Sequence, residues 1–263
     1  MTILTMHQVD AFTDRVFAGN PAAVLILDDW LPEATMQAIA NENNLAETAF
    51  ARPNGNGWDL RWFTPAHEVN FCGHATLATA HVLASVHRVR GDMEFVTRVG
   101  PIRVSQLGNG YRLDLPAFAP EPVEALPPAI AALFPVPPRA LFRNFENVFA
   151  VLADEEAVRA FMPDAAAIAT LAPLCFGITA RGENHDFVSR YFAPSAGIPE
   201  DPVTGSIHAT LVPYWARELG KTRLEAFQAS ARGGHLGCEL AGERVLVTGQ
   251  AATFMKAEIY LPE

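Results

Sequence analysis

A thiol and an imidazole flank a glycine where a helix is expected to begin in the first half of the chain. Cys72 and His74 stand on either side of Gly73, and the small apolar residues that follow predict a buried helix over 75–86. The first N–H groups of a helix lack partners within it and carry partial positive charge. A glycine there lets a carboxylate approach the backbone. The pattern predicts a site for a small anion, although His74 alone fits a structural role and Cys72 alone fits packing.

The second half of the chain carries a similar arrangement before another expected helix. Asp201 precedes Gly205 and Ser206, and a helix is predicted over 206–219. Taken separately, Ser206 fits an N-cap and Asp201 fits a turn before a proline. Two such helix starts facing one cleft would hold a small anion from both sides.

One carboxyl group lies in an otherwise apolar strand entry. Glu47 stands within the segment 44–50, whose remaining residues are mostly small or apolar. Apolar surroundings raise the pKa of a carboxyl group, which is what a general base or proton shuttle needs. The alternative is an exposed glutamate on an edge strand.

The elements that position these residues recur along the chain. Arg61–Pro65 resembles Arg190–Pro194, and His74–Leu77 resembles His208–Leu211, with a glycine shortly before each helix. The offsets (190 − 61 = 129, 208 − 74 = 134 and, for the glycines, 205 − 73 = 132) lie close to half of the 263 residues. Three matches in one order predict an internal duplication, with a period too long for a solenoid.

A proline-rich connector separates the two halves. Eight of the twenty prolines lie between Pro116 and Pro138, where neither a long helix nor regular sheet is expected. We therefore predict domains at 1–118 and 119–263, with the terminal strand allowed to cross to the first domain. Strands are expected at 4–12, 22–27, 47–51, 58–63, 94–105, 110–115, 147–152 and 187–192, and further helices at 32–43, 129–133 and 155–161.

Composition narrows the class of protein. The net charge is −10, from 19 Lys+Arg and 29 Asp+Glu, and no basic cluster occurs, so we expect no nucleic-acid partner. Three cysteines without a CxxC pair argue against a disulfide framework or structural zinc. No signal-like or membrane-length apolar run is seen, which predicts a cytoplasmic protein without a membrane association.

Four motifs together resemble the phenazine-biosynthesis isomerase family (PhzF-like). They are 44–50 (NLAETAF), 61–65 (RWFTP), 72–76 (CGHAT) and 201–206 (DPVTGS), and their order and spacing extend the resemblance over essentially the whole chain.

The resemblance implies an α+β, diaminopimelate-epimerase-like fold. In it, two pseudo-repeated domains each wrap a barrel-like mixed or antiparallel β-sheet around a central α-helix, with the active site in the cleft between them. It implies that Glu47 is the general acid/base that moves a proton within a small, cyclic, unsaturated carboxylic acid. It assigns substrate contacts to five residues near the helix starts: Gly73, His74, Asp201, Gly205 and Ser206. It also implies no metal, no organic cofactor and a homodimer.

Two alternatives stay open. Proline-racemase relatives place a reactive cysteine at each helix start, and Cys72 resembles the first of these, whereas 202–205 lacks a thiol. Cys175 and Cys238 lie outside that motif and fit a buried residue and a strand residue. A one-cysteine racemase, epimerase or dehydratase using Cys72 is therefore the first alternative, and a non-catalytic ligand-binding module is the second.

Overall fold

The protein folds into two compact units. The computed structural model describes residues 1–262. Unit 1 comprises Met1–Asp114 together with the chain from Thr248 onward, and unit 2 comprises Leu115–Val247. The division lies close to the boundary expected after residue 118. The end of the range 119–263 differs, because the last strand returns to unit 1 and pairs there with the first strand.

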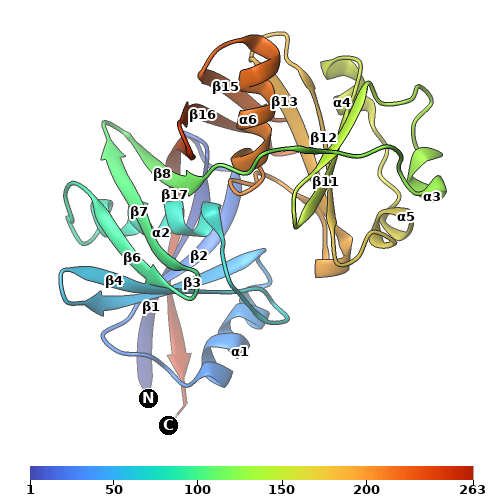
Figure 1. Ribbon diagram of the computed structural model, residues 1–263. Helices are drawn as coiled ribbons and strands as arrows, with labels where there is room; N and C mark the ends of the chain where they lie inside the picture. Colours follow the sequence, from blue (N-terminus) through green and yellow to red (C-terminus); the bar gives the residue numbers. More distant parts are fainter. Residues whose placement is uncertain (263) are drawn as a thin grey trace. The chain divides into compact units, whose positions relative to one another are not determined.

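Unit 1 contains a closed β-barrel (Figure 1). Among the described residues, eight strands pair around the ring in the order β1, β2, β3, β4, β6, β7, β8, β17 and back to β1. The β2–β3 and β4–β6 pairs are parallel, and the short β5 pairs with β4. The bounds are β1 (Thr2–Ala11), β2 (Asn20–Ile26), β3 (Glu47–Asn54), β4 (Gly57–Phe63), β5 (Glu68–Val69), β6 (Met93–Thr97), β7 (Gly100–Leu107), β8 (Gly110–Pro116) and β17 (Arg244–Leu261).

The helix α2 (Gly73–Ser85) is the central element of unit 1. It packs against β1, β2 and β3, and almost every residue in it is buried. Its alanines, threonines and glycine allow this, because small side chains let a helix lie close to the strands around it. The predicted buried helix is confirmed, and it begins two residues earlier than 75. The other helix, α1 (Glu33–Asn43), joins β2 to β3 and confirms the helix expected at 32–43.

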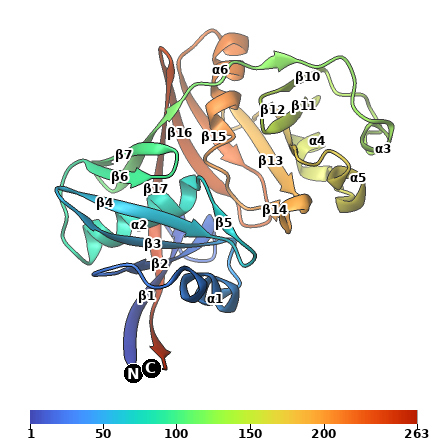
Figure 2. The same cartoon turned by 60° about the horizontal axis from the view of Figure 1, so that its bottom comes forward.

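Unit 2 is a second mixed sheet with its own helices (Figure 2). Its strands pair in the order β9, β10, β11, β12, β13, β15, β16, and β14 adds to β13. The bounds are β9 (Glu121–Pro122), β10 (Ala140–Arg143), β11 (Asn147–Val151), β12 (Cys175–Arg181), β13 (Phe187–Ala193), β14 (Ile198–Asp201), β15 (Arg223–Gln228) and β16 (Gly234–Ala241), with helices α3 (Pro128–Ala131), α4 (Glu155–Ala160), α5 (Ala165–Ala169) and α6 (His208–Leu219) and a 3-10 turn (Pro194–Ala196).

The start of α6 differs from the sequence prediction. The helix begins at His208 rather than at 206, Ile207 is its N-cap, and no side chain caps it. The backbone N–H of Thr204 donates to the side chain of Gln228, which holds this segment in a loop. Gly205 and Ser206 therefore lie in a turn before the helix, and Ser206 is not an N-cap.

The two units share one pattern of strand pairing. In unit 1 the sequence is a parallel pair (β2–β3), a hairpin (β3–β4), a short antiparallel strand (β5), the central helix, a parallel pair (β4–β6) and a hairpin (β6–β7). Unit 2 follows with β11–β12, β12–β13, β14, α6, β13–β15 and β15–β16 in the same orientations. This correspondence supports the predicted duplication.

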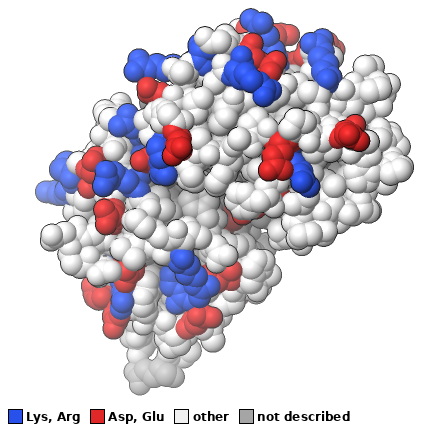
Figure 3. Space-filling model, in the orientation of Figure 1, with Lys and Arg blue, Asp and Glu red and all other residues white. Residues whose placement is uncertain are grey.

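No helix within residues 1–262 is both long enough and apolar enough to cross a bilayer. On the face drawn in Figure 3, acidic and basic side chains are interspersed. That mixture agrees with the absence of a basic cluster in the sequence.

Candidate active site

Glu47 and His74 come together in unit 1. Glu47 is the first residue of β3, and His74 is the second residue of α2. Glu47 Oε2 lies 3.2 Å from His74 Nε2. Glu47 is 9% exposed and His74 is 4% exposed, so the contact is shielded from bulk water. The sequence singled out both residues, and the structure brings them into one cluster.

Asn20 determines which nitrogen of His74 carries the proton. Its side-chain N–H donates to Nδ1 of His74 over 3.1 Å, within the buried cluster. Burial lowers the pKa of His74 to about 3, so the ring is neutral at physiological pH. A neutral ring that accepts at Nδ1 carries its proton on Nε2, which lies 3.2 Å from the Glu47 carboxyl oxygen without the geometry of a hydrogen bond. The contact is therefore between a carboxyl group and a neutral N–H donor.

The strand order explains why Asn20 reaches this cluster. Asn20 begins β2, and β2 runs parallel to β3 with Ala22 opposite Glu47. Both strands therefore begin at the same edge, beside the start of α2. Asn20 was not among the predicted site residues, although the stretch Phe17–Pro21 that contains it also fits the family resemblance. A polar residue directly before a continuous apolar strand was the available signal.

Cys72 lies on the other side of the imidazole. It precedes α2 as the N-cap residue, and its Sγ is 3.4 Å from His74 Nδ1. It is buried, and its backbone carbonyl accepts a hydrogen bond from the Thr76 hydroxyl at 2.6 Å. The thiol is thus adjacent to the pair formed by Glu47 and His74, and not remote from it.

Glu47, Cys72 and His74 also offer one potential metal-ligand atom each, all within 4.8 Å of one another. The carboxyl group faces Nε2 and the thiol faces Nδ1 of the same ring. Because one imidazole cannot direct both nitrogens at a single ion, three-fold coordination requires a rotated side chain. The expectation of no metal stays a prediction.

Asp201 is held in a separate polar network in unit 2. It is buried, and it accepts a short hydrogen bond from the Thr204 hydroxyl. Gln228 donates to the Asp201 carbonyl at 2.8 Å and accepts from the Thr204 N–H at 2.8 Å. This network fixes the loop before α6. Thr204 was not predicted as a partner of Asp201, and Gln228, which lies at the end of β15, carries no local sequence signal.

Gly205 and Ser206 follow this network in the turn before α6. Gly205 is buried and Ser206 is half-buried. Gly73, in unit 1, is the first residue of α2 and is also buried. Gly73 therefore lies at the start of its helix, as predicted, whereas Gly205 lies in the turn three residues before α6. Contact of either glycine with a substrate stays a prediction.

The other two cysteines lie outside these clusters. Cys175 begins β12 and is half-buried, so the expectation of a buried residue is wrong. It lies at the start of a strand because β12 pairs with β11 from Asn147 onward. Cys238 is a buried residue of β16, as expected for a strand position.

Comparison with known proteins establishes the family. Residues 9–257 match the family model described as phenazine biosynthesis-like protein, PhzC-PhzF. The chain belongs to the phenazine biosynthesis-like family. An uncharacterized isomerase from Pseudomonas aeruginosa is 49% identical over 259 residues, covering 98% of this chain and 99% of the relative. The resemblance identified from the four motifs is confirmed, and the protein is an isomerase.

Solved structures confirm the mixed α+β fold of this phenazine biosynthesis-like protein. A PhzF-family protein from Enterococcus faecalis matches with a TM-score of 0.95 and 45% identity, covering 99% of this chain and 100% of that chain. A probable proline racemase from Agrobacterium radiobacter matches with a TM-score of 0.65, covering 98% of this chain and 93% of that chain. It is only 10% identical, so that likeness concerns the fold alone.

Proposed function

We propose that this isomerase moves a proton within a small carboxylic acid without a cofactor, with Glu47 as the general acid/base. The observation that carries the proposal is the buried contact between Glu47 Oε2 and Nε2 of a neutral His74. A shielded carboxyl group with a neutral N–H group close beside it suits proton transfer to and from carbon. An unsaturated cyclic acid, such as the phenazine precursor class, is one candidate substrate.

The proposed reaction balances with one carboxyl group. Glu47 accepts a proton from a carbon made acidic by a neighbouring carboxyl group or double bond, which breaks a C–H bond and forms an O–H bond. The electron pair delocalises through the unsaturated acid. Glu47 then returns the proton to another carbon of the same molecule.

His74 and the start of α2 stabilise the charge that develops in this step. Because burial keeps the imidazole neutral, Nε2–H acts as a hydrogen-bond donor and not as a cation. The N-terminal end of α2 at Gly73 adds its partial positive charge toward an anion. Both features favour the negative charge as it moves from the Glu47 carboxylate to the carbon framework of the substrate.

Asp201, Gly205 and Ser206 are proposed to contact the same substrate from unit 2. This proposal is supported by the hydrogen bonds before α6, in which Thr204 holds the carboxyl group of Asp201 and Gln228 holds its backbone carbonyl. A side chain fixed in this way loses little freedom on binding. A homodimer, a cytoplasmic location and the lack of a cofactor accompany the proposal as predictions.

The thiol alternative rests on the position of Cys72. Its Sγ lies 3.4 Å from an imidazole nitrogen, the usual arrangement for activating a thiol. The same nitrogen already accepts from Asn20, which weakens this alternative. The non-catalytic alternative is not retained, because the protein is an isomerase.

Solvent deuterium exchange separates the two candidates. Candidate unsaturated acids are incubated in D2O with the wild type, Glu47→Gln or Cys72→Ser, and deuterium at carbon is followed by NMR. We expect the Glu47→Gln variant to lose exchange and Cys72→Ser to retain it. Unchanged exchange in Glu47→Gln would end the role of Glu47, and loss confined to Cys72→Ser would establish the thiol mechanism.

A further inference from the structure

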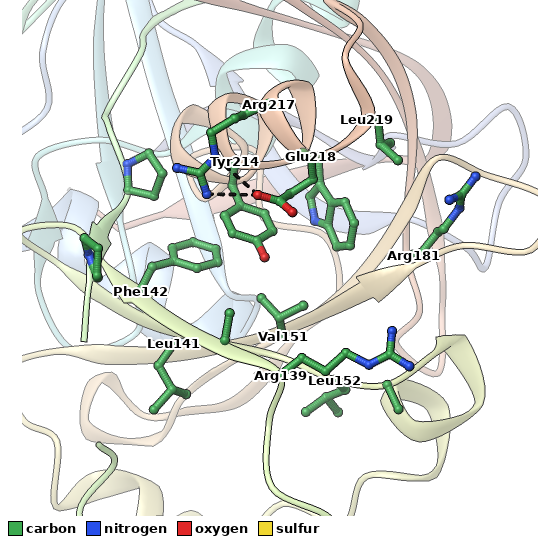
Figure 4. A pocket seen from close by; sticks show the side chains of 15 residues that line it. Arg139, Leu141, Phe142, Val151, Leu152, Arg181, Tyr214, Arg217, Glu218 and Leu219 are labelled. Atoms are coloured by element: carbon green, nitrogen blue, oxygen red, sulfur yellow. Dashed lines mark hydrogen bonds and ion pairs between the residues drawn. The ribbon is translucent and has the colours of Figure 1, made fainter. Parts of the chain in front are cut away.

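A pocket in unit 2 has a basic rim and a largely apolar wall (Figure 4). Its volume is about 490 Å³, which is within the range of small-molecule sites. The lining comes from the start of β10, the end of β11, the end of β12 and the last turn of α6. None of its residues belongs to the Glu47–His74 cluster or to the Asp201 network.

Arginine side chains stand around this pocket although the chain as a whole is acidic. Arg139, Arg181 and Arg217 all line it, against one carboxylate, Glu218. Arg217 is 3.1 Å from Glu218 and is engaged with it. Within residues 1–262, neither Arg139 nor Arg181 lies within 4 Å of a carboxylate oxygen, although the charge of Arg181 acts on Asp186 from further away. Two guanidinium groups are therefore available to an anion, and their planar forks match carboxylate and phosphate oxygens.

A buried tyrosine directs a polar atom into the same space. Tyr214 is only 7% exposed, and its ring stacks on Phe142 with centroids 4.4 Å apart. Its hydroxyl points into the pocket toward the strand that carries Val151 (Figure 4). Within residues 1–262 this hydroxyl has no hydrogen-bond partner, and a bound molecule could supply one. The neighbouring Trp215 already donates to Thr179, so it offers only its apolar surface.

The charged side chains around the pocket favour one orientation of a bound molecule. Arg139 and Arg181 come from the strand side, whereas Arg217 and Glu218 come from the last turn of α6. The carboxyl end of a helix carries partial negative charge, which disfavours an anion beside it. An oxyanion is therefore favoured on the strand side, and an apolar ring on the wall formed by Phe142 and Tyr214.

We propose that this pocket binds a small flat molecule carrying one carboxylate or phosphate group. Arg139 and Arg181 hold the oxyanion, the Tyr214 hydroxyl donates to it, and the ring packs on the apolar wall. Glu218 excludes a second negative group near α6. The site is separate from the proposed chemistry and does not depend on it.

Calorimetric titration of the whole protein with phenyl phosphate and with benzoate tests the proposal. Phenol and benzamidine serve as the neutral and cationic controls. We expect binding of at least one anion at about 1 mM or tighter, and no binding of either control. The stronger of the two anions identifies the oxyanion class. If neither binds, or if a control binds equally, the proposal is wrong.

Matched variants locate the bound anion. Arg139→Gln combined with Arg181→Gln should weaken binding about 100-fold, at about tenfold for each lost charge-assisted contact. Arg223→Gln, which removes another exposed arginine of unit 2, should leave affinity unchanged. Equal weakening by Arg223→Gln would indicate unspecific charge attraction and overturn the proposal. Because all three arginines are exposed, melting curves should show intact folding.

Two further variants separate this site from the candidate active site. Glu218→Gln should strengthen anion binding a few-fold, and Glu47→Gln should leave it unchanged. Loss of binding in Glu47→Gln would place the anion in unit 1 and overturn the proposal. Unchanged exchange chemistry in Glu47→Gln would overturn the proposed function without affecting this pocket.

Discussion

The helices α2 and α6 share the residues His-Ala-Thr-Leu in their first turns, yet the two histidines have different partners. His74 accepts at Nδ1 from Asn20 and presents Nε2 to Glu47. His208 donates from Nδ1 to the Thr204 carbonyl at 2.9 Å. Within residues 1–262 the buried Nε2 of neither histidine forms a hydrogen bond, but that of His74 lies 3.2 Å from a carboxyl oxygen. The imidazole of His74 therefore lies against a carboxyl group, whereas that of His208 holds the loop before α6 to the start of the helix.

The two units also differ in the first residue of the corresponding strands, β3 and β12. Glu47 begins β3 where that strand runs parallel to β2, and Cys175 begins β12 where that strand runs parallel to β11. Burial raises the pKa of the Cys175 thiol, so this group stays protonated at neutral pH. Two units with one pairing pattern therefore differ at this position, where unit 1 has a carboxyl group and unit 2 has a thiol.

The largest expected effect concerns this pair of strand starts. Glu47→Gln should lower kcat about 10³-fold, because general acid/base catalysis of this kind contributes about 10²- to 10⁴-fold. Cys175→Ser changes the matching position of unit 2 and should leave kcat within a factor of a few. Steady-state kinetics on any turned-over acid checks both. A large loss in Cys175→Ser would contradict the difference between the units.

A second comparison concerns the arginine before each helix. Arg61 forms a two-pronged ion pair with Glu68, and Arg190 forms one with Glu200. Arg190 also donates to the Phe161 carbonyl at 2.7 Å. We expect Arg190→Met to lower the free energy of unfolding by about 3 kcal/mol and Arg61→Met by about 2 kcal/mol, because the former also leaves buried backbone carbonyls unpaired. Urea denaturation measures both, and a larger cost for Arg61→Met would reverse the ranking.

Acid stability should depend on both helix-start histidines. Burial lowers the pKa of His74 to about 3 and that of His208 to about 4, from 6.5. Between the folded-state pKa of each histidine and its ordinary value of 6.5, the unfolded chain binds more protons than the folded one. The contribution of these histidines to the free energy of unfolding is therefore fully present above about pH 6.5. It falls as the pH drops, by up to about 1.4 kcal/mol per pH unit for each histidine.

Urea denaturation of the wild type and His208→Asn at pH 7 and pH 5 isolates one of these contributions. The asparagine keeps a donor for the Thr204 carbonyl but does not titrate. The variant should lose less stability between the two pH values than the wild type does. An equal loss in both proteins would show that His208 is not the titrating group.

The smallest expected effect comes from a variant in which His74 takes the tautomer of His208. Asn20→Asp replaces a donor with an acceptor at Nδ1, which draws the His74 proton to Nδ1, as in His208. The Nε2 donor facing Glu47 is then lost. We expect kcat to fall about tenfold, the equivalent of one ordinary hydrogen bond, with KM little changed. The 15N shifts of His74 report the tautomer, and an unchanged tautomer with full activity would contradict this role for Asn20.

The elements with strong periodicity or small-residue patterns could be predicted from sequence. The strand at 22–27 and the helix at 75–86 are confirmed because each buries a continuous apolar surface. The strand β12 and the helix α5 were not predicted. Gly177 sits against the Phe149 ring, a contact that no local pattern reveals, and Ala165–Ala169 is too short to show a period.

Only those residues of the candidate site that belong to a recognisable sequence motif could be predicted. Glu47, His74 and Cys72 stood out by type and position, and they lie together. Asn20 and Gln228 did not stand out, because each acts through a contact distant in sequence: 54 residues separate Asn20 from His74, and 24 separate Gln228 from Thr204. The helix start at 206 was misplaced because the Gln228 contact extends the loop.

One labelling experiment tests most directly whether one carboxyl group carries the proton. A substrate deuterated at the carbon that loses its proton is converted in H2O in a single turnover, and the product is analysed by NMR. If the shielded Glu47 both removes and returns the proton, part of the deuterium will appear at the new carbon. Complete absence of label there, with product formed at the normal rate, would indicate two separate acid/base groups and contradict the account.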